Sequence, residues 1–419
     1  MRKLIGIAIL ALVLVLLVTV VPGCGKGEEK PVPGVTPTPG VTPAVTPTPT
    51  VKTLKIGFLN ALSGPAAPYG TAHELGVKWA ASDINAAGGL KVGRDIYMLK
   101  VVSCDDKWIA SAAVECAQRL IYDEGCKFTI GGIGTVNATK GIFNDAKVIN
   151  VGLGTTRPEA TLPYHINGNT DTEMWAKTWA KQTYEAHPEV KTLAIISPNT
   201  PGSVEWLDAH EAKAVELGQT VVAKEVYTFG ISDFYPLLTK IVAKKPDAIS
   251  LDATPAGDQL LMTKQARELG FTGWIQHATP VSLALMKASM PVSFLYKIAT
   301  NEEVFSDPVF TQSVRDLNDR WLKLYAKPGE SMNTCVIHGY CHVNFLAKAI
   351  EQAGSIDVDQ VLKVFDDPNF RFNRIYVEDA KIGGFETIGI RRQFPHFQAY
   401  SEIQDGQLKL IKAEVVELP

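Results

Sequence analysis

The stretch LKIGFLN at residues 54–60 decides the fold, together with the segments that follow it. Its apolar run predicts a buried strand, and the turn-rich ALSGPAAPYG (61–70) predicts a loop. A helix is expected over 71–87, ended by Gly88 and Gly89. YMLKVVSC (97–104) predicts the next strand, so this unit indicates a right-handed strand–helix–strand crossover and a parallel sheet.

The same alternation runs through most of the chain. Further strands are expected at 127–132, 148–154, 192–198, 220–227, 247–253 and 272–278, with helices between them and beyond, up to about residue 365. The pattern restarts near residue 173, which predicts two α/β lobes, each with its own sheet.

The N-terminus has the layout of a secretory signal. Arg2 and Lys3 precede an apolar run over 4–21, and Pro22, Gly23 and Cys24 close it. This ending resembles a bacterial lipoprotein signal, in which the cysteine, here Cys24, becomes the lipid-bearing first residue. The alternative is an uncleaved membrane anchor. Both interpretations place residues 24–419 outside the cytoplasm, on the outer side of the cytoplasmic membrane (periplasm or cell surface).

Residues 24–52 follow as a linker rich in Pro and Thr (PVPGVTPTPGVTPAVTPTPT). It holds too little apolar surface to offset its ordering entropy, so we expect an extended spacer. The globular part begins near Lys52 and has about 365 residues, more than one core usually serves.

Charge and motifs exclude several classes of protein. The net charge is −3, with no basic tract beyond the signal, so nucleic acid is not expected as a partner. The motifs G-x-S-x-G, H-E-x-x-H, P-loop and G-x-G-x-x-G are absent, so we expect no enzyme and no cofactor. Beyond Cys24 there are five cysteines, Cys104, Cys116, Cys126, Cys335 and Cys341, and their spacing identifies no disulfide.

Residues 54–106 resemble the opening of type I periplasmic binding proteins of the branched-chain amino acid-binding kind. GGIGT (131–135), GTTRPEAT (154–161), NTD (169–171) and QARELGF (265–271) continue the match, which spans nearly all of 53–410. The resemblance implies two doubly wound parallel-sheet lobes joined by three hinge crossings near 171, 301 and 385. Lobe 1 would comprise 53–171 plus 301–385, and lobe 2 would comprise 172–300 plus 386–419.

The same resemblance implies the function. Such proteins clamp a small molecule between the lobes by hinge closure and deliver it to the permease of an ABC transporter. The alternative is a binding module that reports its ligand to a membrane receptor.

Ligands of parallel sheets lie at the carboxyl ends of the strands. The corresponding cleft loops are 61–70, 104–108, 132–137, 153–159, 197–203, 252–257 and 276–280.

Several polar residues match ligand-contacting positions of the family. Thr135 matches a hydroxyl that binds the ligand carboxylate, although an ordinary helix cap is the alternative. Thr155 and Thr156 match the next carboxylate and ammonium contacts. Tyr69 matches an aromatic cover, and Cys335 matches a residue at the ligand mouth.

The second lobe departs from the amino acid binders. Thr279, near His277, stands where they carry an acid for the ligand ammonium, and Gly202 and Pro255 stand where tyrosines are expected. A buried ammonium without a countercharge costs several kcal/mol. Asp252 could replace the acid if its side chain turns inward.

Three tryptophans are expected to lie in the cleft. Trp175 stands where the family usually has Gly, Trp108 follows the CDD sequence, and Trp206 opens a helix of the second lobe. Core packing is the alternative for each. Together with the carboxylate contacts of the first lobe and the missing acid of the second, these tryptophans favour an organic acid, an aromatic acid or an amide as the ligand. A branched-chain or other amino acid is the less favoured alternative.

One later helix carries Cys335, His338 and His342 on one face, a set of soft-metal ligands. We expect this face to pack into the first lobe rather than hold a metal.

Lipidation predicts that Cys24→Ser will lose membrane retention, because the acceptor thiol is gone. Fractionation should show the variant released or unprocessed. A variant as tightly bound and as correctly cleaved as wild type would contradict the lipoprotein interpretation.

Overall fold

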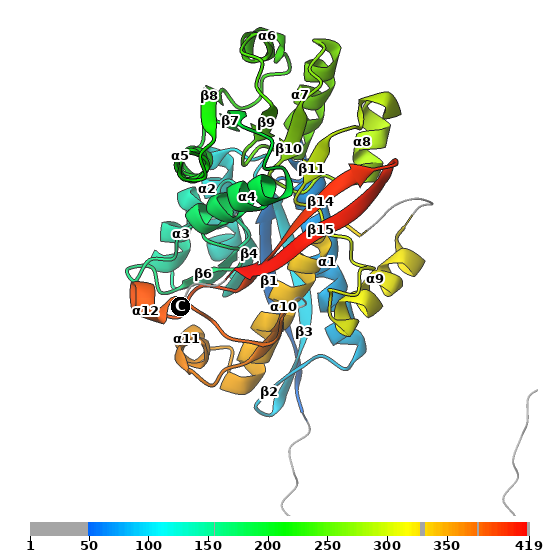
Figure 1. The fold of residues 1–419 in the computed structure, drawn as a ribbon. Helices are drawn as coiled ribbons and strands as arrows, with labels where there is room; N and C mark the ends of the chain where they lie inside the picture. The colour runs from blue at the N-terminus through cyan, green and yellow to red at the C-terminus, as the bar shows by residue number, and fades with distance from the viewer. Residues whose placement is uncertain (1–48, 155, 327–331, 375–376, 417–419) are drawn as a thin grey trace, which may run out of the picture. The chain divides into compact units, whose positions relative to one another are not determined.

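The computed structural model describes residues 49–154, 156–326, 332–374 and 377–416 (Figure 1). The signal, Cys24 and most of the linker lie outside the described residues, as does Thr155. Among the helices of the described ranges, none combines the length and apolarity needed to cross a membrane.

The first sheet holds the sequence that opens the fold. Its order is β2-β3-β1-β4-β5-β6, and all neighbours are parallel except β2, which pairs antiparallel with β3. The strands are β1 (Val51–Asn60), β2 (Leu90–Val92), β3 (Asp95–Asp105), β4 (Phe128–Gly131), β5 (Ile149–Gly152) and β6 (His165–Asn167). The central strands are apolar on both faces, as expected of a sheet covered by helices on both sides.

The second sheet has the order β15-β14-β11-β10-β9-β7-β8. β14 and β15 form an antiparallel hairpin that adds to β11, and β2 adds antiparallel to β3, so each sheet is a parallel core with antiparallel edge strands. The strands are β7 (Thr192–Pro198), β8 (Thr220–Tyr227), β9 (Ala248–Leu251), β10 (Trp274–His277), β11 (Ile298–Thr300), β14 (His396–Gln404) and β15 (Gln407–Val416).

Helices cover the two sheets. In the part of the chain before β7 these are α1 (Ala67–Ala86), α2 (Ala110–Gln118), α3 (Val136–Asp145) and α4 (Thr172–Ala186). They are followed by α5 (Pro201–Glu216), α6 (Tyr235–Ala243), α7 (Ala256–Glu268), α8 (Leu283–Ser289), α9 (Gln312–Leu324), α10 (Thr334–Ala353), α11 (Val358–Asp366) and α12 (Phe385–Ile388). A two-stranded ribbon joins β12 (Phe372–Arg374) and β13 (Val377–Ala380).

The chain passes between the sheets three times. It leaves the first sheet after β6 and enters α4, which packs on α5 and on the β14–β15 hairpin. It returns after β11 to α10, which packs on α1, and leaves again between β13 and β14. The exact lobe boundaries at 171, 301 and 385 stay a prediction.

Two glycines let α1 and α10 approach each other closely. A Cβ on Gly76 would lie 2.0 Å from the carbonyl oxygen of Val336, and one on Gly339 would lie 2.3 Å from that of His73. Neither distance is possible for a real side-chain carbon, so any larger residue must push the helices apart.

One disulfide ties the first sheet to its flanking helix. Cys104 at the end of β3 bonds to Cys116 in α2, with the two Cα atoms 5.7 Å apart. Sequence spacing had left this pairing open. Cys126 and Cys335 are buried free thiols, and Cys341 is buried as well.

Gly339→Ala should lower the free energy of unfolding by about 2–3 kcal/mol, because overpacking forces the backbones of α1 and α10 to shift. Chemical denaturation measures the change. Gly141→Ala in α3 is the matched control, since its Cβ would meet nothing within 4 Å. It should raise stability by ~0.5–1 kcal/mol through helix propensity. Equal effects of the two substitutions would contradict the close-packing argument.

Candidate functional site

A cleft that is partly open to solvent lies where the loops of the two sheets meet, and its empty space, with open solvent included, is about 910 Å³. Each of the seven loops expected from the sequence contributes at least one lining residue. The lining comprises Tyr69, His73, Trp108, Ile133, Gly134, Val136, Asn137, Leu153, Gly154, Asn169, Trp175, Thr200, Gly202, Ser203, Trp206, Ala253, Thr254, Thr279, Pro280, Asn301, Thr334, Cys335 and His338.

Aromatic rings form much of the wall. Trp175 and Trp206 lie with ring centroids 5.0 Å apart, and Tyr69 and Trp108 lie 6.4 Å apart. Trp108 also stacks on Phe229 at 6.3 Å. The structure therefore brings the three predicted tryptophans and Tyr69 to one cavity, where an apolar ligand ring would find large contact surfaces.

Trp108 is held in place by the backbone around it. Its φ is 63°, in the left-handed region, and its backbone N–H donates to Asp106 Oδ1 at 2.9 Å. Its indole covers Gly134, where a Cβ would lie 2.2 Å from the ring atom Cε2. Any side chain at position 134 would thus displace the indole from the start of α3.

Tyr69 reaches across the cleft to residues of the second sheet. Its hydroxyl lies 3.0 Å from Thr279 Oγ1 and accepts from Gln259 Nε2 at 3.1 Å. Thr279 Oγ1 in turn donates to the carbonyl of Thr254 at 2.8 Å. Burial raises the pKa of Tyr69 well above its usual value, so the phenol stays neutral.

The described lining residues include no Asp, Glu, Lys or Arg. Asp252 is fully buried outside the lining, where it accepts from Ser250 Oγ at 2.6 Å and pairs with His210 Nδ1 at 2.7 Å. His277 also lies outside the lining, with Nε2 2.8 Å from Thr263 Oγ1. Thr279 therefore faces the cleft without an acidic neighbour in its lining.

Two of the predicted carboxylate-binding threonines, Thr135 and Thr156, are bonded within the protein. Thr135 is buried and donates to Asp106 Oδ2 at 2.6 Å, and Thr156 donates to Asn137 Oδ1 at 3.0 Å. Neither is among the lining residues, and their contacts with a ligand stay predictions. The lining instead contains Gly134 and Asn137 at the start of α3, Ser203 in α5 and Cys335 in α10, so three helix N-termini meet the cavity.

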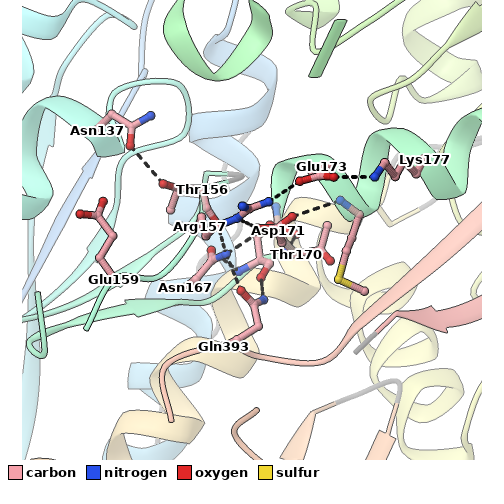
Figure 2. A network of polar contacts seen from close by, with 12 residues as sticks. Asn137, Thr156, Arg157, Glu159, Asn167, Thr170, Asp171, Glu173, Lys177 and Gln393 are labelled. Carbon is pink, nitrogen blue, oxygen red and sulfur yellow. Dashed lines mark hydrogen bonds and ion pairs between the residues drawn. The ribbon is translucent and has the colours of Figure 1, made fainter. Parts of the chain in front are cut away.

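A polar network fixes the first crossing beside this cleft (Figure 2). Arg157 Nε donates to Asp171 Oδ2 at 2.9 Å, and Asp171 Oδ1 accepts from the backbone N–H of Met174 as the cap of α4. Asn167 Nδ2 donates to Gln393 Oε1 at 2.8 Å. These bonds tie the loop after β5 to the start of α4, and β6 to the segment before β14.

The metal hypothesis finds no support in the side-chain arrangement. His342 Nε2 lies 2.8 Å from the carbonyl oxygen of Gly168, and His342 is not among the lining residues, whereas Cys335 and His338 are. Within the ranges that the structure describes, no group of three or more His, Cys, Asp or Glu could hold a metal ion.

Sequence reasoning missed His73 and Glu302. His73 is a lining residue on the buried face of α1, and its Nδ1 lies 2.9 Å from the carbonyl oxygen of Tyr69. Glu302 follows the lining residue Asn301, and both of its carboxyl oxygens are buried with no hydrogen-bond partner among the described residues. Burial raises the pKa of Glu302 to about 8.

The periplasmic binding protein family model matches residues 53–377, and the chain belongs to this family. The chain is 28% identical over 227 residues to an amino acid binding protein of Pseudomonas aeruginosa, with 52% of this chain and 58% of that protein covered. A leucine-, isoleucine-, valine-, threonine- and alanine-binding protein of the same species is 25% identical, with 86% of this chain and 92% of that protein covered. The matches to Escherichia coli Leu/Ile/Val-binding protein span 29% of its length.

A solved solute-binding protein of an ABC transporter from R. palustris, in complex with benzoate, has the same fold. The TM-score is 0.74 at 17% identity, with 87% of this chain and 98% of that chain covered. The expected type I periplasmic binding protein fold is thereby confirmed. Family membership places the chain among binding proteins rather than enzymes.

The buried carboxyl of Glu302 predicts a pH-dependent stability. The unfolded chain releases this proton near pH 4.5, whereas the folded chain holds it until about pH 8. The free energy of unfolding therefore falls across this interval as pH rises. Glu302→Gln should remove that loss. Its free energy of unfolding should exceed that of the wild type by roughly 3–5 kcal/mol at pH 8 and differ little from it at pH 4.5.

Denaturant titrations at both pH values measure this difference. The exposed Glu378→Gln is the control and should behave as wild type at each pH. A Glu302→Gln gain that is equal at pH 4.5 and pH 8 would show that Glu302 ionises in the folded protein as it does in water.

Proposed function

We propose that this chain is an extracytoplasmic, lipid-anchored substrate-binding protein that captures a small aromatic or other organic carboxylate and delivers it to an ABC importer. The observation that carries the proposal is the cleft itself: tyrosine and tryptophan rings form much of its wall, and its described lining has no Asp, Glu, Lys or Arg. Its partners are the ligand, the permease subunits of the importer and the membrane that holds the lipid anchor.

Helix N-termini supply the complement to a ligand anion. The starts of α3, α5 and α10 meet the cavity, and each carries partial positive charge from the helix dipole. The start of α3 has no side-chain cap, whereas Thr200 and Asn333 cap α5 and α10. The indole N–H groups of Trp108 and Trp206 add donors to the same lining. A carboxylate can therefore be bound by dipoles alone, without an arginine or lysine.

An α-amino acid fits the same cleft poorly. Its ammonium group would be buried without an acid in the lining, which costs several kcal/mol. The Pseudomonas aeruginosa relative is named for five amino acids, and the R. palustris neighbour holds benzoate. The aromatic walls and the missing acid at Thr279 align this chain with the second kind of ligand.

The two-sided cleft also supports clamping. Tyr69 on α1 bonds to Thr279 beyond β10, and the N–H of Gly257 donates to the carbonyl of Pro65 at 3.2 Å. A ligand that contacts both sides would add to these contacts and favour the closed state through its differential affinity.

A thermal-shift screen of amino acids, amides and organic acids tests the ligand class, because a ligand that binds only the native state raises the melting temperature. Benzoate or another carboxylate without an α-amine should stabilise the protein more than L-leucine or L-valine. The strongest shift coming from leucine or valine would refute the proposed ligand class. In the best acid complex, Trp175→Leu should weaken binding about 3–10-fold by removing one aromatic wall. Trp274→Leu, outside the cleft, should leave the affinity unchanged.

A further inference from the structure

Most polar atoms that line the cleft are already satisfied within the protein. Thr279 bonds to Thr254, Asn301 Nδ2 donates to the carbonyl of Ala399 at 2.7 Å, and Ser203 Oγ lies 2.7 Å from Thr200 Oγ1. Three buried side-chain nitrogens of the lining have no partner in the described part of the chain: Nε2 of His73, Nε1 of Trp108 and Nε1 of Trp206. Unpaired buried polar atoms are rare in native proteins, so each of these three needs a partner that the described chain does not supply.

The hydrogen-bond role of His73 follows from its other nitrogen. Nδ1 lies 2.9 Å from the carbonyl oxygen of Tyr69, and a carbonyl can only accept. Nδ1 therefore carries the hydrogen, and Nε2 presents a lone pair. Burial lowers the pKa of His73 to about 3, so the ring stays neutral at physiological pH and Nε2 remains an acceptor.

The two indoles have the opposite role. An indole N–H can donate but cannot accept. Trp108 covers the start of α3, and Trp206 lies in α5, so the donors come from both sides of the cleft. Of these three nitrogens, two are therefore donors and one is an acceptor.

We propose that Nε2 of His73 accepts a hydrogen bond from a hydroxyl group of the ligand while the Trp108 and Trp206 indoles donate to ligand oxygens, so that the cleft selects hydroxylated aromatic acids. This inference rests on the proposed function. It goes beyond that function by naming a second polar group on the ligand, the hydroxyl, and the residue that binds it, His73. A carboxylate alone satisfies the donors but leaves His73 unpaired. An unhydroxylated acid should therefore bind about 10–100-fold more weakly than the matching hydroxy acid.

Isothermal titration of the full chain with matched probes tests the inference. The probes are benzoate, 3-hydroxybenzoate, 4-hydroxybenzoate and the methyl ether of each hydroxy acid, which keeps the oxygen but cannot donate. One hydroxybenzoate should bind at least ~10-fold tighter than both benzoate and its own ether. This preference should be constant from pH 6 to pH 8, because the protonation state of His73 does not change there.

Two variants separate the roles of the groups. His73→Asn keeps a donor for the Tyr69 carbonyl but has no acceptor at the Nε2 position, so the preference for the hydroxyl should fall to within ~3-fold. Trp206→Phe removes an indole donor and should weaken every acid about equally, leaving the preference intact. A melting temperature equal to that of the wild type establishes that each variant folds.

The outcomes distinguish the two levels of the argument. If benzoate binds as tightly as both hydroxybenzoates, or if the preference survives in His73→Asn, the inference is overturned and the proposed function stands. If no acid binds while an amino acid does, the proposed function fails and the inference fails with it.

Discussion

The close contact of α1 with α10 is the constraint on which the cleft depends. Gly76 and Gly339 let each helix touch the backbone of the other, at Val336 and at His73. α1 contributes Tyr69 and His73 to the cavity, and α10 contributes Thr334, Cys335 and His338. Since these two helices are far apart in sequence, a contact that fixes their distance also fixes which atoms face the ligand. Packing and recognition are therefore set by the same two residues that lack a side chain.

The cleft works with neutral groups. Tyr69 keeps its proton, His73 stays uncharged, and Glu302 near the second crossing holds a proton that exposed glutamates have lost at neutral pH. All three shifts have burial as their largest cause. A low-dielectric cavity without fixed charges strengthens each remaining dipole, from the helix N-termini to the indole N–H groups. The described lining thus offers hydrogen-bond donors and acceptors rather than partners for an ion pair.

The sequence predicted the elements that are long and periodic, and it failed where tertiary contact decides. Strands at 192–198 and 220–227 and the helix at 334–353 were predicted with the bounds of β7, β8 and α10. β2, β6 and β11 have three residues each, too few for a period to show, and the direction of the β14–β15 hairpin depends on pairing with β11. The seven cleft loops were predictable because parallel strands end at a common edge. That Thr135 bonds Asp106 rather than lining the cavity, and that His73 lines it, depends on side-chain directions which no spacing reveals.

The bond between Cys104 and Cys116 encloses Trp108 in its covalent ring. The loop that presents the indole to the cavity is therefore fastened at both ends, to β3 through Cys104 and to α2 through Cys116. Such bonds form and persist in oxidising compartments and are lost in the cytosol. In a chain folded under reducing conditions, the Trp108 loop would lack this cross-link. The loop would then populate more conformations at the wall of the cavity. The order of the Trp108 loop at the cavity wall is thus coupled to oxidative folding.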